Sequence, residues 1–274
     1  MNSALFLLFL ASLALYLLAA AASLVFFFGG KSEIRQKARQ FFIAAFIVQA
    51  LTFVARFCAF DYAPLTTPHE TLSFFAWGVA CCYLSSIWRF PVKNLGAFVS
   101  LLVLALMLVA AFAAKTPIVP TPALQSGWLS VHASLSLLSY SCFALAGLGG
   151  LMYLLQERTI KRKHFGLMYS RLPSLEVLDR LNHHCLTVGF PLLTLGMVTG
   201  SLWAKQVHGA YWIWNPTEVW SLVSWLLYAG LCHQRFTVGW RGRRAAWLSI
   251  AALVFAVFTF WGVSALFAGY HGQF

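Results

Sequence analysis

The sequence is poor in charged residues. Asp, Glu, Lys and Arg together make up 9% of its 274 residues, whereas soluble domains carry about 25%. Hydrophobic residues make up 61%, and several stretches run for at least 17 residues without a charge. Such stretches are long enough to cross about 30 Å of hydrocarbon as a helix. This balance excludes a soluble globular protein and predicts an integral membrane protein.

The apolar stretches also lack the alternation of apolar and polar residues that the wall of a transmembrane barrel requires. Only α-helices then satisfy the backbone hydrogen bonds in lipid. The predicted fold is therefore all-α, a polytopic integral membrane protein with about eight transmembrane helices in a single domain over 1–274. The first span lacks a basic start and is too long for a signal peptide, so we expect it to be retained. The predicted spans are 4–28, 41–60, 70–88, 95–114, 128–155, 184–204, 217–233 and 246–268.

The six cysteines include no C-x-x-C pair. That absence excludes a thioredoxin-like redox site, and the absence of C-x-x-C-H excludes covalent attachment of haem to this chain. All six lie in or beside the hydrophobic spans, where Cys behaves as a small apolar side chain. We interpret them as core residues.

Acidic residues are scarce as well. The sequence has seven Asp and Glu and 19 Lys and Arg, which gives a net charge of +12. Sixteen of the basic residues fall in four alternate loops, 31–40, 89–94, 156–183 and 234–245. The positive-inside rule places these loops in the cytoplasm, so both termini are predicted to face outward. The charge therefore indicates topology and attraction to the lipid bilayer, and not a nucleic-acid-binding surface.

Local patterns predict where helices begin. Asn215-Pro216-Thr217-Glu218 and Thr67-Pro68-His69-Glu70 each place a capping residue before Pro, with Glu at the third helical position. A further pattern, Leu172, Leu175, Leu178 and Leu181, predicts an amphipathic turn or two along the membrane surface.

The eight histidines divide between the two faces of the predicted topology. Neutral imidazole can coordinate a metal, although a single His at an interface is more often only a hydrogen-bonding residue. His132 begins one span and His271 follows another, so each is tethered at a helix end. The outward histidines are His69, His132, His208 and His271, and the cytoplasmic ones are His164, His183, His184 and His233.

Tryptophan is concentrated in one outward segment, 203–225, which holds five of the eleven. A zinc site usually needs three or four close ligands, often including a carboxylate or Cys, and the outward face offers few carboxylates and no C-x-x-C. A wall of indoles between two histidines suits a flat aromatic cofactor with axial metal positions, such as haem. The alternative is an aromatic belt at the membrane interface, but a belt spreads over all helix ends. The five are Trp203, Trp212, Trp214, Trp220 and Trp225.

The stretch H-G-A-Y-W-I-W-N-P-T-E-V-W, from His208 to Trp220, resembles the tryptophan-rich WWD motif of the CcsA/ResC family of System II cytochrome c biogenesis. The family pattern is roughly W-G-x-x-W-x-W-D-P-K-E-x-W. The flanking segments 189–204 and 225–235, the C-terminal FWGVSALFAGYHGQF, the segment beginning VHASLSLL and the stretch PLTTPHETLSFF resemble the family too. Together they cover roughly the last two-thirds of the chain.

This resemblance implies a set of roles. His132 and His271 would be the outward axial ligands of haem b carried as a substrate, and His233 would be the transmembrane haem site. The chain would act with a CcsB/ResB-type subunit, as a component of a haem lyase whose catalytic residues are unknown, and would present haem to the C-x-x-C-H of apocytochrome c. The setting would be the bacterial cytoplasmic membrane, with a plastid thylakoid membrane as the alternative. Gly209, Trp212, Trp214 and Trp220 would form the surface that faces the haem.

Three positions depart from the family pattern, since His208, Asn215 and Thr217 replace a Trp, an Asp and a Lys. Asn215 keeps the helix cap and loses the charge. His208 could bond a haem propionate or compete as an axial ligand. These changes leave open a HemX-like protein that binds haem and influences haem synthesis without attaching it. A solute transporter is disfavoured because we find no paired helix-breaking segments in two halves.

Overall fold

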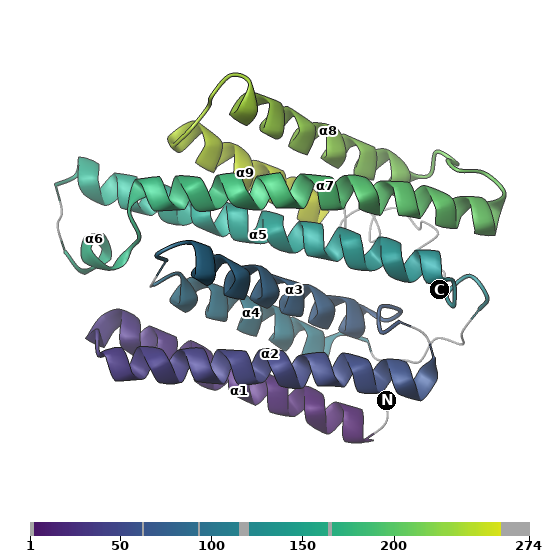
Figure 1. The fold of residues 1–274 in the computed structure, drawn as a ribbon, viewed down its shortest axis with the longest axis horizontal. Coiled ribbons are helices and arrows are strands. Elements are labelled where there is room, and N and C mark those ends of the chain that lie inside the picture. Colours follow the sequence, from purple (N-terminus) through teal and green to yellow (C-terminus); the bar gives the residue numbers. More distant parts are fainter. Residues whose placement is uncertain (1–2, 62, 93, 115–120, 164–165, 259–274) are drawn as a thin grey trace. The chain divides into compact units, whose positions relative to one another are not determined.

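The computed structural model describes residues 3–61, 63–92, 94–114, 121–163 and 166–258. Every regular element in these ranges is a helix (Figure 1). Six of the described helices, α1 to α5 and α7, are long and apolar enough to cross a membrane. The helices are α1 Ser3–Gly29, α2 Ser32–Phe60, α3 Pro68–Arg89, α4 Leu95–Phe112, α5 Gly127–Lys161, α6 Leu167–Arg171, α7 Leu175–His208, α8 Pro216–Phe236 and α9 Arg243–Val257.

The all-α, polytopic membrane fold is thus confirmed. Each of the eight predicted spans coincides with one helix other than the short α6, although the last span, 246–268, runs beyond the described residues. A total of eight spans and the outward termini stay predictions.

Three helices extend well past the predicted spans at the charged end. α2 begins at Ser32 rather than 41, α5 ends at Lys161 rather than 155, and α7 begins at Leu175 rather than 184. Hydrophobicity locates only the part of a helix that lipid surrounds, whereas the backbone hydrogen bonds continue into polar residues. An ion pair four residues apart, Lys161 Nζ to Glu157 Oε1 at 2.8 Å, supports one such extension.

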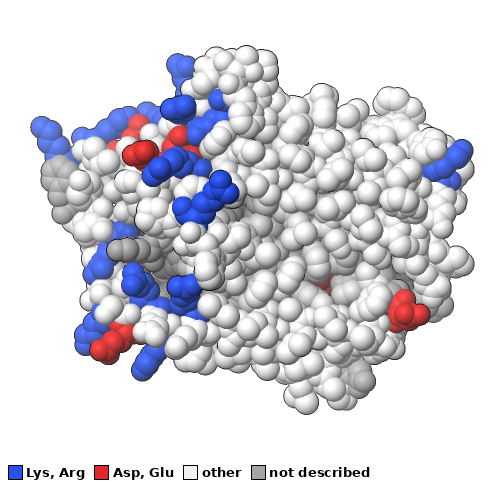
Figure 2. Space-filling model, in the orientation of Figure 1, with Lys and Arg blue, Asp and Glu red and all other residues white. Residues whose placement is uncertain are grey.

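The helices pack as two compact units, residues 1–119 with 156–174 and residues 120–155 with 175–274. We call them unit 1 and unit 2. In each, Lys and Arg gather at one end of the helices, while the face shown is nearly free of charge along the helix lengths (Figure 2). This pattern agrees with the grouping of basic residues in alternate loops. The prediction of a single domain stays a prediction.

Unit 1 is held together by packing of α1 on α2 and α4, and of α3 on α4. A buried polar chain crosses its interior, in which the Tyr16 hydroxyl donates to Gln49 Oε1 at 2.8 Å and Gln49 Nε2 donates to the Ser73 carbonyl at 2.9 Å. The predicted start of α3 is confirmed, because Thr67 and Glu70 form a reciprocal capping box with Pro68 in the first turn.

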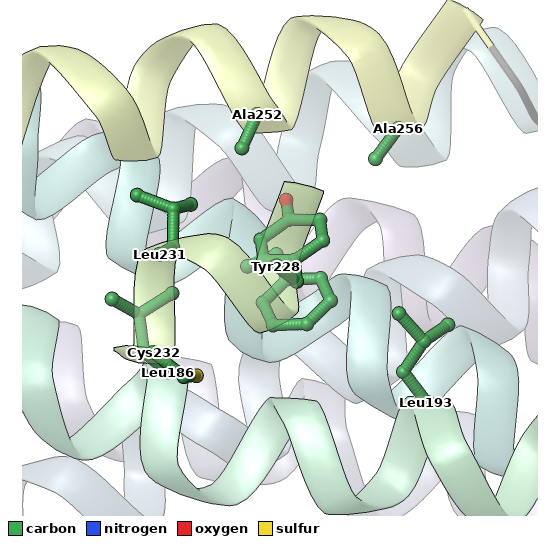
Figure 3. Close-up of a cluster of buried hydrophobic side chains, with 8 residues drawn as sticks. Leu186, Leu193, Tyr228, Leu231, Cys232, Ala252 and Ala256 are labelled. Atoms are coloured by element: carbon green, nitrogen blue, oxygen red, sulfur yellow. The ribbon is translucent and has the colours of Figure 1, made fainter. Parts of the chain in front are cut away.

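Unit 2 contains α7, α8, α9 and most of α5, and a cluster of buried apolar side chains lies in its interior. The rings of Phe143 and Tyr228 stack with centroids 3.5 Å apart. The small side chains of Ala252 and Ala256 on α9 lie over Tyr228 (Figure 3). Of the six cysteines predicted to be core residues, Cys142, Cys185 and Cys232 are buried, and Cys81 and Cys82 are half-buried. The prediction is wrong for Cys58, which is exposed on the surface of α2.

The structure corrects the predicted amphipathic turn at the membrane surface. Leu178 and Leu181 belong to α7, which runs without a break to His208, and both side chains are fully buried. Leu181 Cδ2 lies 3.7 Å from the position that a Cβ would take on Gly149 of α5. The apolar stripe of this segment therefore packs against protein rather than lying on lipid.

Candidate functional site

The Trp-rich segment 203–225 consists of the last turns of α7, a short loop and the first half of α8. Gly209 follows the last residue of α7 with a φ of 77°, a conformation that glycine adopts without steric cost. Lys205 Nζ donates to the Gly209 carbonyl at 2.6 Å, which stabilises the turn that follows α7. The turn sends the loop back toward α8.

The predicted helix start at Asn215 is confirmed. Asn215 Oδ1 accepts a hydrogen bond from the Glu218 backbone N–H at 2.7 Å, and Pro216 is the first residue of α8. The Glu218 carboxylate accepts from the Ile213 N–H at 2.9 Å. These bonds fix the loop on α8, and Asn215 performs the capping with a neutral amide.

Asn215→Ala is expected to lower the free energy of unfolding by about 1 kcal/mol, because the Glu218 N–H loses its acceptor. Asn215→Asp should keep the protein at least as stable, since a carboxylate caps equally well and complements the helix dipole. Thermal unfolding in detergent would measure both. A loss of stability in Asn215→Asp equal to that in Asn215→Ala would contradict this account of the cap.

The five tryptophans of the segment occupy different environments. Trp203 is buried and its Nε1 donates to the Ala123 carbonyl at 3.1 Å. Trp225 Nε1 donates to Thr194 Oγ1 at 2.9 Å. These two side chains therefore join α7 to Ala123 and α8 to α7 within unit 2, a role that the concentration of Trp in the sequence did not distinguish.

Trp212 and Trp214 lie on the loop and contact each other edge to face, with ring centroids 5.8 Å apart. Trp214 is 73% exposed and has a φ of 57°, which is uncommon for a bulky residue. The Trp212 indole N–H is buried and has no partner among the described residues. Trp220 packs on Phe255 and Phe258, with centroids 5.4 Å away in each case.

His132 lies in the second turn of α5 and is half-buried. Its Nδ1 is 2.7 Å from the Gly196 carbonyl oxygen of α7. The ring fills the space beside Gly200, where an added Cβ would lie 2.6 Å from Nδ1. His132 is thus fixed in position by two glycines of α7.

An open hollow of about 480 Å³ lies where α5 begins and α7 nears its end. Trp128 stands in it one helical turn before His132, and its side chain is 43% exposed. Ser126 Oγ donates to Gln206 Oε1 across the hollow at 2.7 Å. The lining residues are Ser126, Gly127, Trp128, Val131 and Gln206.

The other histidines predicted to face outward differ from His132. His208, the last residue of α7, contacts Trp203 edge to face at 6.1 Å. His69 belongs to unit 1, where it is buried and its Nδ1 lies 2.6 Å from the Ala110 carbonyl. His271 lies outside the described residues. The structure thus brings His132, His208 and the Trp-rich loop into one unit.

His233 lies near the end of α8 and is exposed, with Nδ1 3.4 Å from Thr237 Oγ1. Beside it in sequence, Arg235 donates to both carboxylate oxygens of Asp179, at 2.8 and 2.6 Å. Arg235 Nε also lies 3.4 Å from His183 Nδ1. No pattern in the sequence indicates this ion pair, because Arg235 is there only one of several basic residues in a loop.

The comparisons with known proteins agree with this architecture. The family model described as cytochrome C assembly protein matches residues 6–271. The cytochrome c biogenesis protein CcsA of Guillardia theta is 32% identical over 250 residues, covering 84% of this chain and 82% of that protein. CcsA of Parasynechococcus marenigrum (strain WH8102) is 32% identical over 245 residues, covering 80% of each.

A solved structure shares the fold. The cytochrome c haem lyase CcmF superposes with a TM-score of 0.62 at 19% identity, covering 93% of this chain. This chain spans 46% of the length of that protein. The family model matches nearly the whole of this chain, and two relatives are 32% identical to it. The chain therefore belongs to the cytochrome c assembly protein family.

Proposed function

We propose that this protein binds haem at the outward end of unit 2 and presents it for covalent attachment to apocytochrome c. The observation that carries the proposal is the geometry of His132. A carbonyl oxygen can only accept a hydrogen bond, so the 2.7 Å contact with Gly196 requires the proton on Nδ1. In the neutral ring Nε2 then holds the lone pair that an iron ligand needs.

The loop supplies a surface for the flat face of the porphyrin. Trp214 exposes 73% of its side chain beside Trp212, and a large apolar side chain held in solvent at a loop tip suits a ligand. Gly209, with a φ of 77°, sets the turn that carries this loop. Trp220 contributes indirectly, because it packs α8 on Phe255 of α9.

The second axial ligand in this proposal is His271, which also belongs to the stretch matched by the family model. His208 is the alternative within unit 2, at the end of α7 beside Trp203. His233, exposed near the end of α8, would receive haem on the cytoplasmic side. A bis-imidazole iron of this kind is low-spin.

The partners follow from the same chemistry. Haem b would be the transported substrate, a CcsB/ResB-type membrane subunit would complete the haem lyase, and the C-x-x-C-H of apocytochrome c would receive the haem. The names of the relatives support a role in cytochrome c biogenesis. Several of them come from cyanobacteria, which supports the proposed bacterial cytoplasmic membrane. The relative from Guillardia theta supports the alternative, a plastid thylakoid membrane.

The test is the double variant His132→Ala/His271→Ala. Wild-type protein purified in detergent should carry haem with a low-spin spectrum, and the double variant should lose that spectrum together with mature c-type cytochromes. His208→Ala on the same background shows whether His208 substitutes for His271. An unchanged spectrum and normal cytochrome maturation in the double variant would refute the proposal.

The HemX-like alternative predicts a different phenotype. His208 and Asn215 favour it, because they replace residues of the family motif. A deletion strain would then accumulate altered levels of haem precursors while c-type cytochromes still mature. Normal precursor levels with no mature c-type cytochrome would exclude that alternative.

A further inference from the structure

We infer that Gly196 and Gly200 of α7 are positioning residues that fix the tautomer and the direction of His132, so that only its Nε2 can meet an iron. The inference rests on the proposed haem binding and names which atom of this chain performs it. It concerns a contact between α5 and α7, both within unit 2.

The Gly196 carbonyl selects the tautomer. It accepts from His132 Nδ1 at 2.7 Å and also lies 2.9 Å from Thr199 Oγ1. Because an oxygen of this kind has no proton to give, the ring must present N–H at Nδ1. A histidine that donates one ring N–H to a backbone carbonyl is held in orientation and becomes a more basic metal ligand through the other nitrogen.

The space at Gly200 fixes the direction of the ring. A Cβ built there would lie 2.6 Å from His132 Nδ1 and 2.8 Å from Cε1, closer than unbonded carbon and nitrogen atoms approach. A Cβ at Gly196 would lie 2.7 Å from Ser136 Oγ, one turn further along α5. The G-x-x-x-G spacing therefore puts both glycines on the face of α7 that contacts α5, as in closely packed membrane helices.

Helix propensity alone disfavours this arrangement. Glycine within a helix is less stable than alanine because it loses more backbone freedom on folding. Neither glycine needs a positive φ, so backbone conformation does not require them. Packing against α5 requires them instead, since any side chain at position 200 must displace the His132 ring and lengthen its hydrogen bond to Gly196.

The first experiment compares Gly200→Ala with Gly230→Ala in the full-length, haem-loaded protein. Gly230 is a matched control, because it also lies within a helix of unit 2 and a Cβ there would meet nothing within 4 Å. Electron paramagnetic resonance should show the low-spin signal unchanged in Gly230→Ala, and shifted or replaced by a high-spin signal in Gly200→Ala. A wild-type signal in Gly200→Ala would overturn the inference.

The second experiment tests the hydrogen bond between the ring and the Gly196 carbonyl without adding a side chain to α7. It also replaces the first experiment if Gly200→Ala does not fold. His132→Gly opens a space that free imidazole can fill, and imidazole has an N–H to donate to Gly196 whereas 1-methylimidazole has none. Titration should restore the low-spin spectrum with imidazole at a concentration at least tenfold lower than with 1-methylimidazole. Equal concentrations would overturn the inference while leaving His132 as a ligand.

These outcomes separate the inference from the proposed function. If His132→Gly keeps its low-spin spectrum with no added imidazole, His132 is not a ligand, and both proposals are wrong. If the spectrum is lost and both imidazoles restore it equally, haem binding at His132 stands and the positioning role of Gly196 is wrong.

Discussion

Asp179→Asn is expected to lower the free energy of unfolding by about 3 kcal/mol, the lower end of the cost of breaking a buried ion pair. The Asp179 carboxylate accepts from two nitrogens of Arg235 and from the Gly242 N–H at 2.8 Å. The two side chains are only 16% and 7% exposed. Loss of the negative charge leaves the Arg235 guanidinium buried without a counterion.

The pair joins three elements of unit 2. Asp179 is on α7, Arg235 is near the end of α8, and Gly242 precedes the first residue of α9. Arg235 also donates to the Trp240 carbonyl at 3.1 Å. Its loss should therefore loosen the ends of α7, α8 and α9 that meet at this pair, which hydrogen exchange in that region would detect.

Glu176→Gln provides a matched control on the same helix. Glu176 pairs with Arg180 at 3.9 Å, but the two side chains are 78% and 57% exposed, and exposed pairs contribute less than about 1 kcal/mol. Thermal unfolding in detergent should separate the two variants clearly. Equal melting temperatures for Asp179→Asn and Glu176→Gln would show that the buried pair contributes little.

The double variant Trp212→Ala/Trp214→Ala is expected to weaken haem binding by about two orders of magnitude. If each indole covers the porphyrin with roughly a third of its 150–250 Å², the two together contribute about 3 kcal/mol at 25 cal/mol per Å². Titration of the purified protein with haem, followed in the Soret band, would measure the change.

Stability should change little in that variant. Trp214 is 73% exposed, so removing its indole takes away little packing inside the protein. Trp88→Ala is the matched control, because Trp88 is 82% exposed on α3 of unit 1 and should leave haem affinity unaltered. Equal haem affinities for the double variant and Trp88→Ala would show that the loop does not contact haem.

Much of the candidate site follows from local sequence. The cap at Asn215 and the turn at Gly209 could be predicted because each depends on residues within four or five positions. The tryptophans were harder to assign. Trp203 and Trp225 belong to the same Trp-rich segment as Trp214, and the sequence does not distinguish them from it. Their indoles donate to residues 80 and 31 positions away, which no local pattern reveals.

Composition and local patterns are enough to predict a bundle of membrane helices, the starts of α3 and α8, and a set of candidate residues for haem binding. Hydrophobic length, charge and capping are properties of neighbouring residues, so they can be read without a structure. They also locate His132 at the start of a span.

The way in which His132 is held and the burial of particular charges depend on contacts between residues far apart in the chain. His132 meets the Gly196 carbonyl across 64 residues, and Arg235 meets Asp179 across 56. Such contacts depend on the rotation and register of one packed helix against another. Those are set by the fit of side chains such as Gly200 and Ser136, because interiors are close-packed and a single methyl group changes which atoms can meet.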